Sequence, residues 1–465
     1  MGGQTHARRI EGDIVRRGDP GYEHAWQGIL WNGVKPPRFP DVIVRVASER
    51  DVPEAVALAR SEGLRIAVRS GGHSWCGSPL RDGGMLIDLS ALNRIHVDPD
   101  SATATVQPAA TGRALAAELS RHGLAFPTGH CGSVALGGYL LSGGLGWNSG
   151  ALGPACASLR QIEAVTAAGE VVTCDTDENS DLFWAARGAG PGFFAIVTGF
   201  RLALYPRPAA IVTTTYAFPL ADVVPVTRWV TEAATELPPT VELSFVLGTA
   251  DPAMSAATPR PKVVIVAATA FADSQEEAIR SLGPLRVCPL ADHAIFQQAD
   301  EPTTLEVLYE TSGTVWPASH RCGADTLWSG ADYETLLSRL APVVAVAPSE
   351  KSLVLAPVSP VSQEKALQHD MAYSVLGDSY VVPFAIWDSA AQDDANISWL
   401  RDAMRIVEPL GTGHYIAEAD LTADPSRARR SFSPSDWDRL GRLKARYDPD
   451  DVFFSYLGRS ATWAA

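Results

Sequence analysis

The apolar pattern from position 41 onward predicts a strand, a helix and a second strand in succession. Residues 41–47 (DVIVRVA) are rich in β-branched side chains and alternate with polar ones, which is typical of a strand. Ser48 or Asp51 can cap a helix that runs to about Arg60. Residues 64–70 (LRIAVRS) return as a strand. The segment predicts a β-α-β unit that opens into a glycine-rich loop.

The stretch up to Pro206 continues with short strands and helices. Thr111 is placed to cap a helix that ends near Gly123, with its apolar positions on one face. Residues 162–172 predict a hairpin, and residues 177–188 predict a helix. Further strands are predicted at residues 84–90, 94–98, 102–108 and 195–205.

The region from about residue 209 to 410 changes character, because long apolar strands alternate there with long helices. This succession favours an α+β layer in which the helices pack on one sheet. The tail predicts a helix, a turn that contains proline and a short aromatic run. The strands are predicted at 211–218, 241–248, 262–270 and 380–387, the helices at 332–342 and 394–407, and the tail elements at 437–458.

Composition and charge exclude several classes of protein. The chain has 465 residues, 46% of them hydrophobic, and no low-complexity tract, so it is expected to be globular. Its net charge of −15 argues against nucleic acid or an anionic membrane as a partner. No apolar run reaches the ~18–20 residues of a membrane span, and the start has no signal-peptide core, which favours a cytoplasmic protein. The six cysteines are scattered, so neither a disulfide framework nor a zinc site is expected, and no metal is predicted.

Two glycine-rich segments carry the candidate chemistry. Residues 70–78 read SGGHSWCGS, and residues 128–150 read TGHCGSVALGGYLLSGGLGWNSG. Exposed backbone N–H groups in such loops can bind phosphate without lysine. Neither segment is a P-loop, and neither fits the dinucleotide fingerprint. The sequence thus predicts a phosphate-bearing cofactor but disfavours a nicotinamide-binding Rossmann domain.

These segments resemble the flavin-binding motifs of berberine bridge enzyme-like oxidases, a branch of the vanillyl-alcohol oxidase flavoprotein superfamily. The similarity covers nearly the whole chain, and its motifs occur in the family's order. They are residues 69–74 (RSGGHS), 129–139 (GHCGSVALGGY), 142–147 (SGGLGW), 181–185 (DLFWA), 194–198 (FAIVT), 447–449 (YDP) and 452–453 (VF).

The resemblance implies an FAD-linked oxidase with a two-part FAD-binding domain and an α+β substrate domain. The FAD-binding domain would comprise residues 1–206 and 412–465, and residues 207–411 would form the substrate domain. His73 would bond the flavin 8α-methyl carbon, and Cys131 would bond ring carbon C6. The residues implied at the cofactor are Arg69, Ser70, Gly71, Gly72, His73, Ser74, Gly129, Cys131, Val134, Gly137, Gly138, Tyr139, Ser142, Gly143, Gly144, Gly146, Val197 and Tyr456.

The implied reaction is hydride abstraction from a C–H bond of an alcohol, a sugar or a natural-product intermediate, followed by reduction of O₂ to H₂O₂. Val134 matches the position that gates oxygen in the family, and a bulky small-molecule substrate is expected. Two alternatives remain: a flavin dehydrogenase that uses another electron acceptor, and a non-catalytic flavoprotein that sequesters a metabolite.

The catalytic base is expected where family members carry Tyr-x-Asn-Tyr in a late strand. Here the stretch reads Tyr415-Ile416-Ala417-Glu418. On a strand Glu418 would share a face with His414 and Asp420, and a buried carboxylate there can accept a hydroxyl proton. Tyr415 and Tyr139 are the next candidates.

The chain departs from the family in other places, and some assignments have structural alternatives. His73 can instead be a capping or core histidine, and Cys131 a buried, inert thiol. Val134 can simply pack in the core, and Glu418 can be a solvated carboxylate at the end of a strand. Middle-region residues that can line the cleft are Trp316, His320, Arg321, His369 and Trp387; the departures are Leu145, Ala157-Ser158 and Ser455-Tyr456-Leu457.

Overall fold

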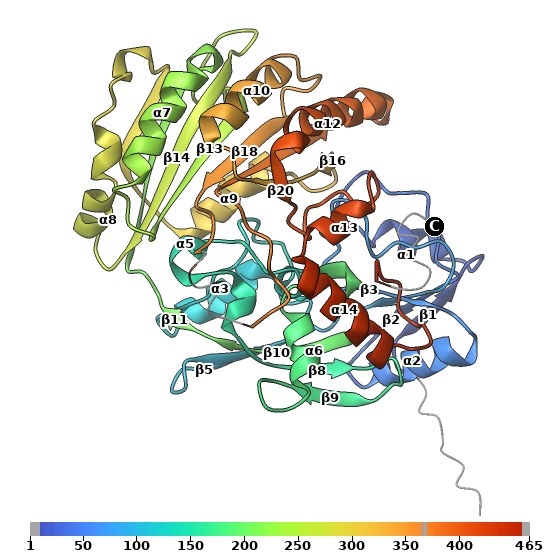
Figure 1. Ribbon diagram of the computed structural model, residues 1–465. Coiled ribbons are helices and arrows are strands. Elements are labelled where there is room, and N and C mark those ends of the chain that lie inside the picture. Colours follow the sequence, from blue (N-terminus) through green and yellow to red (C-terminus); the bar gives the residue numbers. More distant parts are fainter. Residues whose placement is uncertain (1–9, 363, 365, 367–369, 458–465) are drawn as a thin grey trace, which may run out of the picture.

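The computed structural model describes residues 10–362, 364, 366 and 370–457. Residues 1–9, which belong to the segment without a signal-peptide core, lie outside the described residues. His369, a predicted cleft residue, also lies outside them. Figure 1 shows a large sheet with its helices in the upper part of the molecule and smaller sheets below it.

The predicted β-α-β unit forms the first of the lower sheets. Strands β2 and β3 both run parallel to β4, which lies between them, and β1 adds an antiparallel edge. Buried apolar residues of α2 pack on this sheet. The elements are β1 (Asp13–Arg16), α1 (Tyr22–Gln27), β2 (Val42–Arg45), α2 (Asp51–Ser61), β3 (Ile66–Arg69) and β4 (Met85–Asp88).

A second lower sheet is antiparallel, in the order β5-β6-β10-β8-β9. The predicted hairpin is confirmed as β8 and β9, and the predicted cap of α3 is confirmed because Thr111 accepts a hydrogen bond from the Ala114 N–H. The elements are β5 (Ile95–Asp98), β6 (Thr103–Val106), α3 (Gly112–Ser120), β7 (Leu124–Ala125), α4 (Leu136–Leu141), α5 (Ser149–Leu152), β8 (Leu159–Val165), β9 (Val171–Cys174), α6 (Ser180–Ala186), β10 (Ile196–Ala203) and β11 (Tyr205–Pro206), which pairs with β7.

The upper sheet is antiparallel, and helices α7, α8, α10 and α12 pack on one of its faces, as the α+β prediction requires. Its described strands follow the order β15-β12-β14-β13-β18-β19-β17-β20, with β16 paired to β19. The elements are β12 (Ala210–Pro219), α7 (Val223–Ala234), β13 (Val241–Thr249), β14 (Lys262–Ala272), α8 (Gln275–Ser281), β15 (Phe296–Thr303), α9 (Leu305–Val315), β16 (Arg321–Ala324), β17 (Leu327–Ser329), α10 (Tyr333–Ala345), β18 (Leu353–Val358), β19 (Ser379–Trp387), α12 (Asp393–Val407) and β20 (Gly411–Gly413).

Strand β19 separates two hydrophobic clusters. Tyr380 and Phe384 point to the cluster shared with the lower sheets, whereas Val381 and Ala385 point to the cluster under the helices. Successive side chains of a strand point to opposite faces, so a strand buried on both faces is a continuous apolar run. This places one face of the upper sheet against the glycine-rich loops.

The tail returns to the lower part of the molecule. Helices α13 (Ser426–Arg430) and α14 (Pro434–Tyr447) follow β20, and Phe453 bridges in parallel to Ile66 of β3. The domain boundaries near residues 206 and 411 stay predictions; β12 begins at Ala210, and β20 ends at Gly413.

The predicted late strand at Tyr415–Glu418 is wrong. The chain leaves β20 after Gly413 and forms a turn in which the N–H groups of Glu418 and Ala419 both donate to the Tyr415 carbonyl. Glu418 therefore has no strand face to share with His414 and Asp420. We call residues 414–420 the catalytic-candidate turn.

Candidate active site

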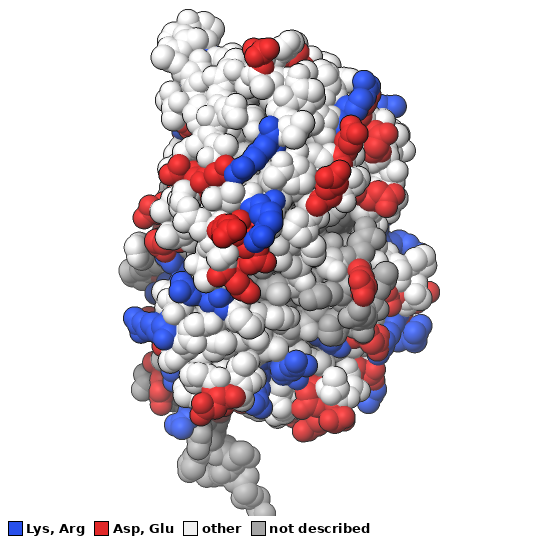
Figure 2. Space-filling view, turned by 90° about the vertical axis from the view of Figure 1, so that its left-hand side faces the viewer, with Lys and Arg blue, Asp and Glu red and all other residues white. Residues whose placement is uncertain are grey.

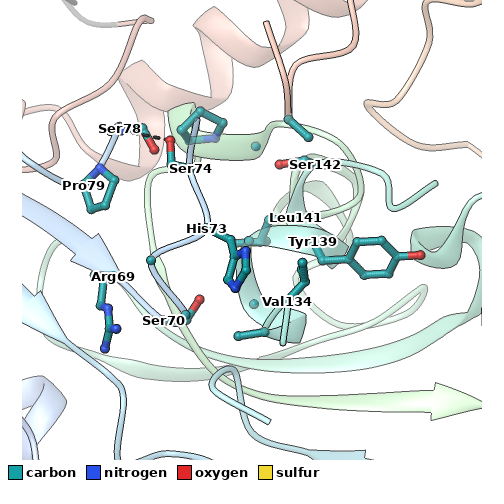
Figure 3. A pocket seen from close by; sticks show the side chains of 18 of the residues that line it. Arg69, Ser70, His73, Ser74, Ser78, Pro79, Val134, Tyr139, Leu141 and Ser142 are labelled. Carbon is teal, nitrogen blue, oxygen red and sulfur yellow. Dashed lines mark hydrogen bonds between the residues drawn. The ribbon is translucent and has the colours of Figure 1, made fainter. Parts of the chain in front are cut away.

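A cavity of about 340 Å³ lies between the two glycine-rich loops, the upper sheet and the catalytic-candidate turn. Most of the predicted cofactor residues line it, and Figure 3 shows His73 at its centre. From the implied set the lining residues are Arg69, Ser70, Gly71, Gly72, His73, Ser74, Gly129, Cys131, Val134, Gly137, Gly138, Tyr139, Ser142 and Val197, together with Tyr415 and Glu418.

The first loop begins where β3 ends. The Arg69 guanidinium donates to the Asp88 carboxylate at 2.8 Å and to the Ile29 carbonyl, which fixes the start of the loop. Gly72 has a φ of +74°, and a Cβ there would lie 2.2 Å from the Ile29 carbonyl oxygen, so only glycine fits.

The backbone of this loop is equipped to bind an anion. The N–H groups of residues 70–74 donate no hydrogen bond to any group in the described part of the chain. Buried backbone donors normally have a partner, and a row of free N–H groups at a cavity wall is a site for phosphate oxygens. The first loop therefore fits a diphosphate.

The second loop packs directly on the first. A Cβ on Gly71 would lie 2.5 Å from the Ala135 Cβ, and a Cβ on Gly137 would lie 2.8 Å from Ser70 Oγ. A Cβ on Gly138 would meet nothing within 4 Å, although Gly138 lines the cavity. Glycines thus bring the loops together and keep this wall of the cavity open, which fits a flat ring system.

The side chain of His73 extends from the first loop to the second. Its ring stacks on Trp31, with centroids 5.1 Å apart, and hydrogen-bonds to the Ser133 backbone. Burial, and then the charge of Arg69, lower the pKa of His73 to about 4. The imidazole is therefore neutral at neutral pH, which is the nucleophilic form.

Cys131 lines the same cavity from the second loop and has a free thiol. Burial, and then the nearby Glu418 carboxylate, raise the pKa of this thiol to about 11. His73 and Cys131, distant in sequence, are thus brought to one cavity.

Glu418 reaches the cavity from the catalytic-candidate turn. Its Oε2 accepts a hydrogen bond from the Tyr380 hydroxyl at 3.0 Å, and the Trp75 indole also hydrogen-bonds to the carboxylate. Burial raises the pKa of Glu418, while these two donors oppose the shift. The solvated strand-end alternative does not apply, because the carboxylate is enclosed and oriented.

The two candidate tyrosines are engaged in structural hydrogen bonds. The Tyr139 hydroxyl donates to the Pro127 carbonyl at 2.6 Å, and Figure 3 shows its ring directed away from His73. The Tyr415 hydroxyl accepts from the Gly144 N–H at 3.0 Å and from the Leu145 N–H at 3.4 Å. Burial raises the pKa of both phenols, so neither is a ready base.

Four predicted cofactor residues lie behind the cavity wall rather than on it. Gly143 is left-handed, with a φ of +113°, and a Cβ there would lie 2.7 Å from the Tyr373 ring. The N–H groups of Gly144 and Gly146 bond to Tyr415 and Ser149, and the Tyr456 hydroxyl donates to the Ala189 carbonyl. These residues shape the second loop and its support.

Four aromatic side chains, which no motif in the sequence indicates as a group, form an aromatic wall of the cavity. Trp31 and Trp75 meet edge to face at 5.3 Å, Trp75 lies 5.1 Å from Phe384, and Phe384 lies 5.4 Å from Trp316. All four residues line the cavity. Only Trp316 was expected at a cleft; among the other candidates, Arg321 and Trp387 both bond to Asp393 elsewhere, and His320 pairs with Asp388.

Comparisons with known proteins identify the family of the chain and its fold. Residues 40–175 match the FAD binding domain family. The FAD-linked oxidoreductase ptmO of Penicillium ochrochloron is 32% identical over 445 residues, which cover 95% of each chain. The structure of 6-hydroxy-D-nicotine oxidase from Arthrobacter nicotinovorans superposes with a TM-score of 0.83 at 23% identity, covering 98% of this chain and 99% of that one. Berberine bridge enzyme from Eschscholzia californica gives 0.79 at 18% identity, covering 96% of each chain.

The chain has the FAD-binding fold of berberine bridge enzyme, which confirms the resemblance. It belongs to the FAD-linked oxidoreductases.

Among the described helices, none has the length and apolar character that crossing a lipid bilayer would take. On the face in Figure 2, acidic and basic side chains are intermixed.

Proposed function

We propose that the protein is an oxidase that holds FAD through both His73 and Cys131 and oxidises a C–H bond of a small molecule. The observation that carries this proposal is the convergence of His73, Cys131 and Glu418 on one cavity that residues 70–74 also line, and the N–H groups of these five residues donate no hydrogen bond to a described residue. The N–H groups would hold the diphosphate, and the two nucleophiles would hold the ring system. When bound, FAD supplies a two-electron acceptor that dioxygen can reoxidise.

The residues of the chain then prepare the substrate. Glu418 accepts the proton of a substrate hydroxyl or amine, and the Trp75 and Tyr380 donors hold its carboxylate in one orientation. The aromatic wall would cover a ring-bearing substrate and exclude water from the reacting bond. Val134 lines the cavity, and its small side chain would leave a path for oxygen.

The test is an anaerobic screen in which flavin absorbance is followed after addition of alcohols, sugars and aromatic natural-product intermediates. We expect at least one of them to bleach the flavin and to yield stoichiometric H₂O₂ when air is admitted. Bleaching followed by slow reoxidation in air, with fast turnover on an artificial acceptor, would make the protein a dehydrogenase. Tight binding without bleaching would make it a sequestering flavoprotein.

A further inference from the structure

His130 is a second polar group at the cavity, directly before Cys131. Its side chain is 40% exposed and lines the cavity, and its Nε2 lies 2.5 Å from the Glu242 carboxylate. Its ring also meets Trp147 edge to face at 4.4 Å. The other ring nitrogen, Nδ1, makes no hydrogen bond to a described residue.

Glu242 is placed to hold this imidazole. It lies on β13 between Val241 and Leu243, which point into the cluster under the helices, so Glu242 faces the glycine-rich loops. Its other oxygen accepts from the Asn148 N–H at 2.8 Å. The carboxylate is thus fixed at both oxygens, and it orients the His130 ring through Nε2.

The charges around His130 favour the imidazolium. Desolvation at the cavity wall lowers the pKa of His130, but the Glu242 carboxylate on β13, and then Glu418 on the catalytic-candidate turn, raise it overall. Protonated His130 carries an N–H at Nδ1 while Nε2 remains bound to Glu242. His130 and Glu418 line the same cavity, so the protonated imidazole would offer its Nδ1–H on the wall that also presents the carboxylate.

We propose that His130 donates a hydrogen bond from Nδ1 to a neutral oxygen of the substrate, so that the site takes ring compounds bearing a hydroxyl or carbonyl oxygen. Two carboxylates, Glu242 and Glu418, flank the imidazolium, so an anionic group would meet net repulsion there. The aromatic wall supplies the surface for the ring.

This inference rests on the proposed function and makes it more specific. For an alcohol, the oxygen would accept from His130 and donate its proton to Glu418. The O–H bond would lose its proton to Glu418, the C–H bond would lose a hydride to the cofactor, and the carbonyl that forms would keep the hydrogen bond from His130. His130 would thus bind the alcohol and its product through the same atom.

The test uses isothermal titration calorimetry of the purified holoenzyme with acetophenone, ethylbenzene and benzoate, since calorimetry requires neither turnover nor bleaching. We expect acetophenone to bind more tightly than the two others. The variant His130→Phe keeps an aromatic ring beside Trp147 but removes the hydrogen bond from the charged donor. Its affinity for acetophenone should therefore be about 10- to 100-fold lower than that of the parent. Ethylbenzene should bind the variant and the parent alike.

The control is His122→Phe. His122 lies in the segment that follows α3, pairs with Glu118 of that helix and is not among the residues that line the cavity. It should leave all three affinities unchanged. Equal affinity for acetophenone and ethylbenzene, or an acetophenone affinity that survives in His130→Phe, would overturn the inference. Failure of every alcohol, sugar and aromatic intermediate in the anaerobic screen to bleach the flavin would instead count against the proposed function.

A second variant separates hydrogen bonding from packing. Glu242→Gln keeps the shape of the side chain and removes its charge, so the pKa of His130 should fall. Acetophenone affinity is highest below the pKa of His130 and declines as pH rises through it. That decline should begin at lower pH in Glu242→Gln, and an unchanged pH profile would contradict a role for the imidazolium.

Discussion

The Tyr380 hydroxyl on β19 donates to the Glu418 carboxylate at 3.0 Å and thereby joins the upper sheet to the catalytic-candidate turn. Tyr380 is buried, and its ring lies tilted against Trp328 with the ring centroids 4.4 Å apart. Burial and the Glu418 carboxylate raise the pKa of Tyr380 well above its ordinary value. The phenol is therefore a fixed donor, and it lowers the pKa of Glu418 against the effect of burial.

Tyr380→Phe should raise the pKa of Glu418 further. A hydrogen bond to a charged group contributes ~1.5–3 kcal/mol, which corresponds to about 1–2 pH units. Because the base works only when ionised, the acidic limb in the pH profile of the flavin-reduction rate should move to higher pH by about that amount. Tyr216→Phe is the matched control, since its hydroxyl bonds to Leu285 under the helices. An acidic limb at the same pH as in the parent would show that Tyr380 does not set the pKa of the catalytic base.

The two proposed covalent links are tested by acid precipitation. We expect the denatured protein to stay yellow and one flavin-bearing fraction to contain peptides with both His73 and Cys131. His73→Ala or Cys131→Ala alone should keep the flavin attached, and the double variant should release it. Cys174→Ala, a buried cysteine outside the cavity lining, should behave like the parent. An unchanged spectrum and attachment in Cys131→Ala would disprove the thioether.

Val134 should control the oxygen half of the reaction. Val134→Leu adds bulk at the cavity wall, so reoxidation in aerated buffer should slow while anaerobic reduction keeps its rate. Val134→Ala should reoxidise at least as fast as the parent. Stopped-flow absorbance measures both steps, and equal reoxidation in all three proteins would show that Val134 is only a packing residue.

Local signals predicted the lower half of the molecule well. The β2-α2-β3 unit, the Thr111 cap and the β8-β9 hairpin depend on neighbouring residues, and all three are confirmed. The predicted cap of α2 is wrong. Neither Ser48 nor Asp51 caps that helix, and the Asp51 carboxylate instead accepts from the N–H groups of Glu11, Gly12 and Ala47. Glu11 and Gly12 are about 40 residues away in the sequence, and Ala47 precedes the helix. The residues around the helix start therefore could not reveal that the Asp51 carboxylate is engaged by these N–H groups.

The site itself was predicted only where motifs are contiguous. The turn at residues 414–420 is set by remote partners: His414 bonds to the Thr326 carbonyl, the Tyr415 N–H donates to the Thr326 hydroxyl, and the Asp420 N–H donates to Asp325. These contacts replace the strand that the sequence suggested. The aromatic wall combines four separate segments, and no spacing in the sequence connects them.

Glu418→Gln tests the central claim most directly. The amide keeps the shape of the side chain but cannot accept the proton, and general-base catalysis typically contributes ~10²–10⁴-fold. We therefore expect the anaerobic rate of flavin reduction to fall by about that factor, with substrate affinity and flavin spectrum nearly unchanged and with the acidic limb of the pH profile lost. A variant that reduces its flavin within a few-fold of the parent would contradict the assignment of Glu418 as the base.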